Sequence, residues 1–203
     1  MQHYRSSLAI IMAALATVSC GKSAPPAAPQ APAQCPVQNI TVSILSSPTI
    51  NRSRDGEARP VVVRLYQLKA DARLVNTSFE QIWKDEKTTL GEDLVSSREM
   101  EIFPGTRTDV AFERAPTVNH VAGVGLFATP TGHAWLYSFD LPPVPEPGKC
   151  GAGACAPGDD DCENANADKL HLIYYIDGNK IDDGVEHLEE YPSQGKMKTK
   201  THG

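Results

Sequence analysis

Alternation of apolar and polar side chains runs through most of the chain beyond residue 37, and it constrains the fold more than any other feature of the sequence. The pattern is clearest in ITVSI, Ile40–Ile44, and in LHLIYYI, Leu170–Ile176. Two shorter segments show the same spacing, Met100–Ile102 and Val110–Phe112. A period of two is typical of half-buried strands. We therefore predict that all four segments are β-strands.

Further strands are predicted where the chain is more continuously apolar or aromatic. Val61–Leu68 (VVVRLYQL) and Val121–Ala128 (VAGVGLFA) have the character of central strands. Trp135, Tyr137 and Phe139 place three aromatic side chains on one face of another strand, which we interpret as core. Turn-forming residues separate the strands at Pro104-Gly105-Thr106, Thr131-Gly132 and Asp177-Gly178.

One segment is expected to be helical. Thr77-Ser78 can cap a short helix in which Glu80 or Gln81 completes a capping box. Its apolar residues fall on one side and are Phe79, Ile82 and Trp83. About eight short strands with one helical insertion indicate an all-β sandwich and not an α/β fold. We assign this sandwich to residues 37–190.

The N-terminal region has the layout of a lipoprotein signal peptide, residues 1–19. Arg5 precedes an apolar run, Leu8–Ala16, that is much shorter than the roughly 20 residues a membrane-spanning helix needs. Thr17-Val18-Ser19-Cys20 resembles a bacterial lipobox, in which the Cys is acylated and becomes the mature N-terminus. Cys20 is therefore the expected lipid attachment site. The alternative is an ordinary secretory signal that is cut nearby and leaves Cys20 unmodified or removes it.

Residues 20–36 are rich in Ala and Pro and are expected to form a tether. They contain too few branched apolar residues to build a core, and a Pro-rich spacer rises about 3.1 Å per residue. In the enteric lipoproteins that the lipobox resembles, Asp after the Cys signals inner-membrane retention, so Gly21 points to the outer membrane. At the other end, residues 191–203 are predicted to be a flexible basic tail that carries Lys196, Lys198 and Lys200.

Net charge and motif content exclude two large classes of function. Removing the signal peptide takes away Arg5 and no acid, so 18 Lys and Arg remain against 25 Asp and Glu and the net charge changes from −6 to −7. An acidic chain without a basic patch is not expected to bind nucleic acid. We find no G-x-S-x-G or H-E-x-x-H motif, and we expect no enzyme activity. The histidines considered as catalytic groups stand singly, at His120, His133, His171 and His187.

Four cysteines remain once Cys20 is assigned to lipid, and an even number suits disulfides in an oxidising compartment. They are Cys35, Cys150, Cys155 and Cys162, and their three alternative pairings cannot be distinguished. Three of them lie in an acidic insertion, residues 142–168. The spacing lacks the C-x2-C pairs of zinc sites, and the acids lack EF-hand spacing. We therefore predict no metal site there. The acids considered as calcium ligands are Asp159, Asp160, Asp161 and Glu163.

A set of motifs occurs in a characteristic order over residues 37–141. After the lipobox and tether come PTINRSRDGEARPVVVRLYQLK, FEQIW, TLGEDL and FPG. The most informative positions are Asn51, Asp55-Gly56, Pro60–Leu68, Leu90-Gly91 and Pro104-Gly105. In this order the motifs resemble the TssJ family, also called SciN or VasD, the outer-membrane lipoproteins of the type VI secretion system.

This resemblance implies a transthyretin-like β-sandwich of two four-stranded sheets with a short helical insertion. It also implies a structural role, without a cofactor other than the covalent lipid. Family members sit on the periplasmic side of the outer membrane, in its inner leaflet, and bind the periplasmic C-terminal domain of TssM within a larger assembly. Their partner-binding loop maps to residues 48–59. The contact residues expected here are Ile50, as an apolar anchor, and Asn51, Arg52, Arg54, Asp55, Gly56, Glu57 and Arg59.

Two other functions remain compatible with the sequence. One is a lipoprotein that binds a small ligand, a sugar or calcium through the acidic Cys-rich insertion, and deleting residues 142–168 would distinguish it from a TssM-binding protein. The other is an exported enzyme, which would require His or Asp side chains to converge in a pocket.

Overall fold

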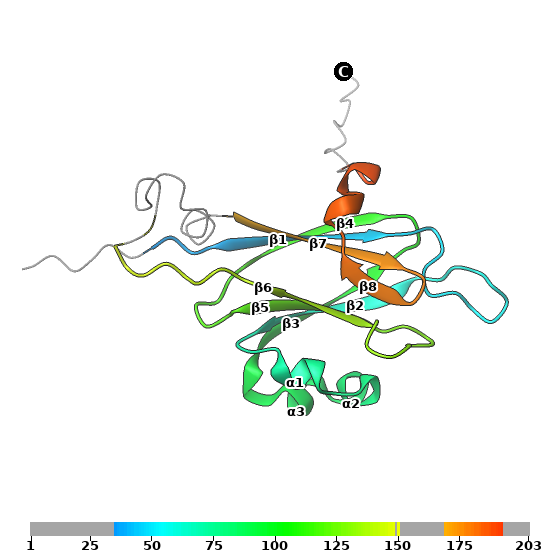
Figure 1. The fold of residues 1–203 in the computed structure, drawn as a ribbon, viewed down its shortest axis with the longest axis horizontal. Coiled ribbons are helices and arrows are strands. Elements are labelled where there is room, and N and C mark those ends of the chain that lie inside the picture. The colour runs from blue at the N-terminus through cyan, green and yellow to red at the C-terminus, as the bar shows by residue number, and fades with distance from the viewer. Residues whose placement is uncertain (1–34, 149, 151–168, 193–203) are drawn as a thin grey trace, which may run out of the picture. The chain divides into compact units, whose positions relative to one another are not determined.

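The computed structural model describes residues 35–148, 150 and 169–192. Two four-stranded sheets pack face to face, and short helices lie on the outer side of one of them (Figure 1). The predicted all-β sandwich is confirmed. The strands are β1 (Asn39–Ser46), β2 (Val61–Leu68), β3 (Leu94–Ile102), β4 (Arg107–Glu113), β5 (His120–Gly125), β6 (Leu136–Asp140), β7 (Lys169–Asp177) and β8 (Lys180–Asp183). The helices are α1 (Ala72–Val75), α2 (Phe79–Lys84), α3 (Glu86–Leu90) and the 3-10 helices η1 (Gly91–Asp93) and η2 (Val185–Glu190).

The first strand occupies a central place in its sheet. One sheet has the order β4-β1-β7-β8 and the other β3-β2-β5-β6. Neighbouring strands are antiparallel except β1 and β7, which are parallel. Ile40, Val42 and Ile44 of β1 are fully buried in the core. The alternating pattern thus places every second residue of β1 inside the sandwich.

The two sheets approach closely around Tyr174 of β7. Its hydroxyl donates a hydrogen bond to the carbonyl of Val121 in β5, with an O···O distance of 2.8 Å. A Cβ added to Gly123 would lie 2.9 Å from ring atoms of Tyr174 and 2.9 Å from Cδ1 of Ile181. Because real Cβ atoms need more room, only glycine fits at this position.

The predicted aromatic strand is only partly as expected. Tyr137 and Phe139 lie in β6 and pack edge to face, and Phe139 contacts Tyr174 across the sandwich with ring centroids 4.9 Å apart. Trp135 comes before β6, and its ring packs against Phe79 of α2 at a centroid distance of 5.5 Å. All three rings contribute to packing, but Trp135 holds the helical insertion.

Strand β5 is shorter than the predicted segment, which extended to Ala128. The strand ends at Gly125 because the chain folds back on itself there. The amide of Phe127 donates to the carbonyl of Gly125 at 3.0 Å. A Cβ on Gly125 would lie 2.5 Å from the Phe127 ring. The apolar run therefore continues past the strand as a turn that packs into the core.

The helical insertion contains more turns than predicted. Ser78 caps α2, and Gln81 completes the capping box, as expected. Ile82 is fully buried, but Trp83 is 55% exposed and does not share its side of the helix. The short helices α1 and α3 were not predicted. None of the helices in the described ranges has the length and apolar character needed to span a bilayer.

A buried polar contact joins the helices to the sheet. The hydroxyl of Tyr66 in β2 donates to Oε2 of Glu86 in α3 at 2.7 Å. Arg64, two residues earlier in β2, forms an ion pair with the same carboxylate at 3.4 Å and donates to the carbonyl of Ile82 at 3.3 Å. Burial and the hydrogen bond to Glu86 raise the pKa of Tyr66 far above its ordinary value. The hydroxyl therefore stays protonated and able to donate.

Candidate functional site

The loop between β1 and β2 contains two buried residues, Ile50 and Asn51, which we call its root. Ile50 is fully buried in the core cluster, and Asn51 is only 8% exposed. The side chain of Ile50 fills the core of its own domain and is not exposed as the apolar anchor that the sequence predicted. The side chain of Asn51 is taken up by internal hydrogen bonds, and its direct contact with a partner stays a prediction.

Asn51 fixes the position of the loop through three hydrogen bonds. Its Nδ2 donates to the carbonyl of Pro60 at 2.8 Å, and its Oδ1 accepts from the amide of Ala128 at 2.9 Å. Its own amide donates to the carbonyl of Gly178 at 2.8 Å. Its φ is +46°, a left-handed conformation that Asn tolerates better than other side chains. One residue thus ties the loop to two neighbouring turns.

Replacing Asn51 with Ala is expected to lower the free energy of unfolding by about 2–5 kcal/mol. Left-handed backbone costs Ala about 1–2 kcal/mol, and a buried amide that loses its acceptor costs about 1–3 kcal/mol. Asn51→Gly is the matched control, since it keeps the conformation and loses only the side-chain hydrogen bonds. Urea unfolding followed by circular dichroism should rank wild type above Gly and Gly above Ala. Equal stability of all three proteins would contradict this role of Asn51.

Residues 52–59 form the exposed arm of the loop. The amide of Ser53 donates to the carbonyl of Glu57 at 2.8 Å, and Gly56 turns the chain with a φ of +85°. The predicted contact residues in the arm are all exposed, and they are Arg52, Arg54, Asp55, Gly56, Glu57 and Arg59. Within residues 35–148, 150 and 169–192, no ion pair involves any of these charged groups.

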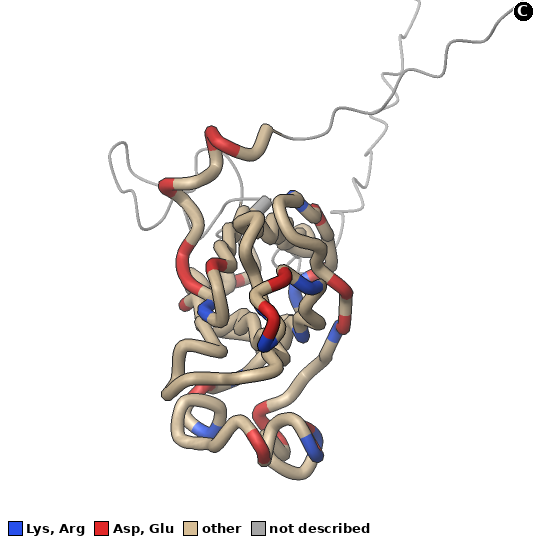
Figure 2. Tube along the Cα trace, turned by 90° about the vertical axis from the view of Figure 1, so that its right-hand side faces the viewer, with Lys and Arg blue, Asp and Glu red and all other residues tan. Residues whose placement is uncertain are grey.

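Figure 2 looks onto the end of the sandwich that carries the exposed arm, and charges of both signs lie there. A groove of about 580 Å³ runs beside the arm, between Arg52, Arg54 and Arg59 on one side and Ala128-Thr129 on the other. The arm therefore presents three exposed guanidinium groups next to a concave surface. Such groups can bind acidic side chains or backbone carbonyls of a protein partner.

An apolar groove of about 650 Å³ adjoins the first one, and Ala128 lines both. It runs between α2 and the turn after β5, and its walls include Phe79, Trp83 and Phe127. Trp83 is 55% exposed at its edge. Trp and Arg are the residues most enriched at binding hot spots. Sequence reasoning missed this groove because it placed Trp83 on the same side of the helix as Ile82, which is buried.

The remaining predicted site residues fall into two groups. A disulfide joins Cys35 to Cys150, with the Cα atoms 5.6 Å apart, and so connects the segment before β1 to the acidic insertion. Cys20, Cys155, Cys162 and the acidic residues 159–163 lie outside the described residues.

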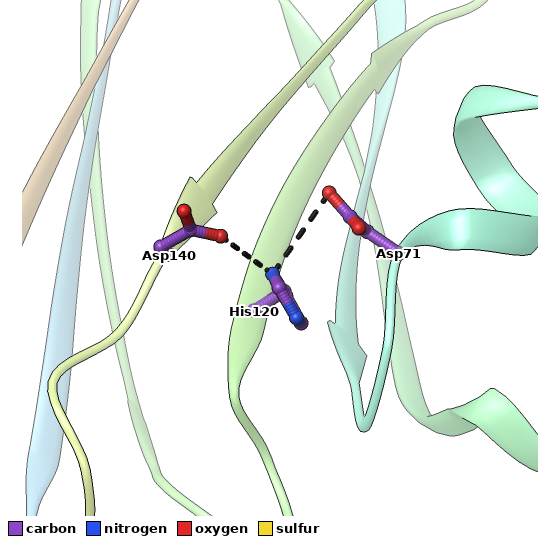
Figure 3. Close-up of side chains that lie close together, drawn as sticks. All are labelled: Asp71, His120 and Asp140. Carbon is purple, nitrogen blue, oxygen red and sulfur yellow. Dashed lines mark ion pairs between the residues drawn. The ribbon is translucent and has the colours of Figure 1, made fainter.

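The structure also brings together three titratable residues that no sequence motif connects, Asp71, His120 and Asp140 (Figure 3).

Comparison with known proteins identifies one family. The profile of the type VI secretion lipoproteins (VasD, EvfM, TssJ) matches residues 38–155, which is more than half of the 203-residue chain. No curated protein matches the chain.

Solved structures share the fold. Serratia marcescens Lip, a membrane-bound component of the type VI secretion system, superposes with a TM-score of 0.57 at 17% identity, over 71% of this chain and 96% of Lip. The lipoprotein TssJ1 of Pseudomonas aeruginosa gives 0.53 at 20% identity, over 72% and 95%. A chain of a type VI membrane complex gives 0.55 at 16% identity, over 73% and 98%. At these identities the likeness shows the fold alone.

The family match carries the assignment, and the sandwich with its helical insertion agrees with it. The protein belongs to the TssJ family of type VI secretion lipoproteins, which are structural proteins and not enzymes.

Proposed function

We propose that this protein anchors the type VI secretion membrane complex to the outer membrane by binding the periplasmic C-terminal domain of TssM. In this proposal Cys20 carries the lipid in the inner leaflet of the outer membrane. Residues 20–36 form a tether that reaches up to about 50 Å when extended. The folded domain then faces the periplasm.

The ends of the sandwich are suited to these two tasks. Cys35 lies just before β1, whereas the exposed arm follows the end of β1, so the two occur at opposite ends of the domain (Figure 1). The eight residues of β1 span about 25 Å. The disulfide from Cys35 to Cys150 fixes the point where the tether meets the domain. A partner bound at the arm is therefore held away from the lipid.

The single observation that carries the proposal is the exposed arm itself. Its charged side chains are unpaired within the described residues, yet its root is held rigidly by Asn51. A preordered loop loses little conformational entropy when it binds. Beside it, the groove at Trp83 can accept an apolar side chain of the partner. Arm and groove together offer a polar rim with an aromatic anchor, as protein interfaces commonly do.

Replacing Cys20 with Ser is expected to separate anchoring from binding. Without a lipid, the variant should appear in the soluble periplasmic fraction, and secretion by the system should be lost. It should still copurify with the TssM domain, because the arm is unchanged. Ser23→Ala, a substitution within the tether, is the matched control and should stay with the outer membrane. Membrane fractionation with immunoblotting measures the outcome, and a Cys20→Ser protein that remains in the outer membrane would contradict the anchor.

A further inference from the structure

Three side chains from separate elements converge beside the helical insertion (Figure 3). Asp71 precedes α1, His120 begins β5 and Asp140 ends β6. Nδ1 of His120 lies 2.8 Å from Oδ1 of Asp140 and 3.8 Å from Oδ2 of Asp71. Among the described residues, this is the one group of three or more His, Cys, Asp or Glu whose potential ligand atoms all lie within 4.8 Å of one another.

The side chain of Asp71 does not cap the helix that follows it. It is the N-cap residue of α1, where an Asp side chain ordinarily accepts hydrogen bonds from helix amides. Here its carboxylate caps no amide and is directed at His120. Two cations lie two residues away in sequence: Arg73 pairs with Asp93 at 2.9 Å, and Lys69 forms no ion pair with a described residue. In the described part of the chain, no Lys or Arg forms an ion pair with Asp71 or Asp140.

Nδ1 of His120 is buried and makes no hydrogen bond to any described residue. The distance of 2.8 Å between Nδ1 and Oδ1 of Asp140 is short enough for a hydrogen bond, but the angle is unsuitable. The carboxylate lies off the line along which an Nδ1–H group would point. A buried polar atom without a partner is costly and calls for an explanation. One carboxylate on each side of a buried ring nitrogen is an arrangement that ligands take around a common ion.

The spacing agrees with a tetrahedral metal. Zinc binds His nitrogen and carboxylate oxygen at roughly 2.0–2.2 Å, so two of its ligand atoms lie about 3.3 Å apart. The two distances from His120 Nδ1, 2.8 and 3.8 Å, bracket this value. Asp140 is 88% exposed and can adjust its position, and its exposure leaves a path for an ion to enter. Water can supply the fourth ligand.

We propose that Asp71, His120 and Asp140 form a binding site for a divalent transition metal of the zinc class. The imidazole nitrogen favours zinc over magnesium or calcium, which prefer oxygen ligands. The ion compensates the two carboxylates and joins α1 to the ends of β5 and β6. It thereby fastens the helical insertion to its sheet. Sequence reasoning did not predict this site because Asp71, His120 and Asp140 are far apart in the chain and no spacing motif connects them.

The test uses the full-length protein purified in detergent, freed of tags and metal, with zinc alone as the probe. Zinc affinity is measured by competition with a chromophoric chelator, and thermal unfolding is recorded with and without zinc. His120→Gln and Asp140→Asn remove ligands. His187→Gln is the matched control, because His187 also faces an acid, Glu190, at 3.2 Å, but belongs to no group of three potential ligands among the described residues.

Wild type is expected to bind one zinc ion at this site and to unfold at a higher temperature with zinc than without it. His120→Gln should weaken the affinity by at least about 100-fold, because removing even an outer-shell partner costs 10–100-fold. His187→Gln should bind like wild type, and magnesium should give no thermal shift. If Asp140→Asn and His120→Gln bind zinc as tightly as wild type, or if wild type binds none, the three residues form only a surface ion pair and the proposal fails.

Discussion

Replacing Arg114 with Met is expected to lower the free energy of unfolding by about 3–5 kcal/mol. Arg114 follows β4 and is only 3% exposed. Its Nε and one terminal nitrogen donate to the carbonyl of Val118, at 2.9 and 2.6 Å. The other terminal nitrogen donates to Oε1 of Gln38 and to the carbonyl of Pro142, both at 2.8 Å. One guanidinium thus joins three segments that are distant in the sequence.

The size of this effect follows from the buried acceptors that Met would leave behind. A buried polar group that loses its partner costs about 1–3 kcal/mol, and Met fills the space without donating. Burial lowers the pKa of Arg114, but an arginine remains charged at any pH of interest. Lys should rescue only part of the loss, because a single ammonium group cannot reproduce the planar fork.

Urea unfolding gives the comparison directly. Arg98→Met is the matched control, since Arg98 is exposed and its bond to the carbonyl of Ala111 is long, at 3.4 Å. Its stability should change by no more than about 0.5 kcal/mol. An Arg114→Met protein as stable as Arg98→Met would show that the guanidinium does not hold these segments together.

The second large effect is expected from the disulfide between Cys35 and Cys150. It closes a loop with a sequence separation of 115 residues. Constraining a loop of this length in the unfolded chain is worth roughly 4–5 kcal/mol in the entropic model. Changing both cysteines to Ser should lower the free energy of unfolding by about 3–5 kcal/mol. The segment before β1 would then have no covalent link to the insertion.

Thermal unfolding with and without a reductant distinguishes the stabilising effect of this disulfide from effects of the other cysteines. Wild type should lose stability when it is reduced, and the Cys35→Ser, Cys150→Ser protein should lose much less. Mass spectrometry confirms which bond has been reduced. If wild type is equally stable with this bond open and closed, the disulfide does not stabilise the domain.

Local sequence patterns predicted the strands and turns well because their causes are local. Val61–Leu68 was predicted with the bounds that the structure shows. The turn at Asp177-Gly178 joins β7 to β8, and Gly178 adopts a φ of +56°. The Ser78 cap was also correct. Strand alternation, positive φ and capping each depend on only a few consecutive residues.

The parts of the site that were missed depend on distant packing. Ile50 occurs in a polar stretch, and only the assembled core shows that it is buried. Trp83 was assigned to the apolar side of a helix, but the surrounding helices leave it half exposed. The partner of Cys35 and the approach of Asp71 to His120 depend on which elements meet in three dimensions. No period or spacing in a single sequence encodes these contacts.

The exposed arm is the feature on which the proposed function depends most. Its contribution can be isolated by changing Arg52, Arg54 and Asp55 to Ala together, because all three are exposed and the root at Asn51 is left intact. The matched control changes Lys69, Arg98 and Glu113 to Ala. It removes the same number of charges of each sign from exposed positions outside the arm.

The most direct measurement is the affinity of the full-length protein, in detergent, for the periplasmic C-terminal domain of the cognate TssM. Saturable binding is expected for wild type and for the control. The arm variant should bind at least about tenfold more weakly, since loss of an interface hot spot costs about 2 kcal/mol or more, while its circular dichroism spectrum stays unchanged. A folded wild-type protein that does not bind TssM, or an arm variant that binds as tightly as wild type, would contradict the account.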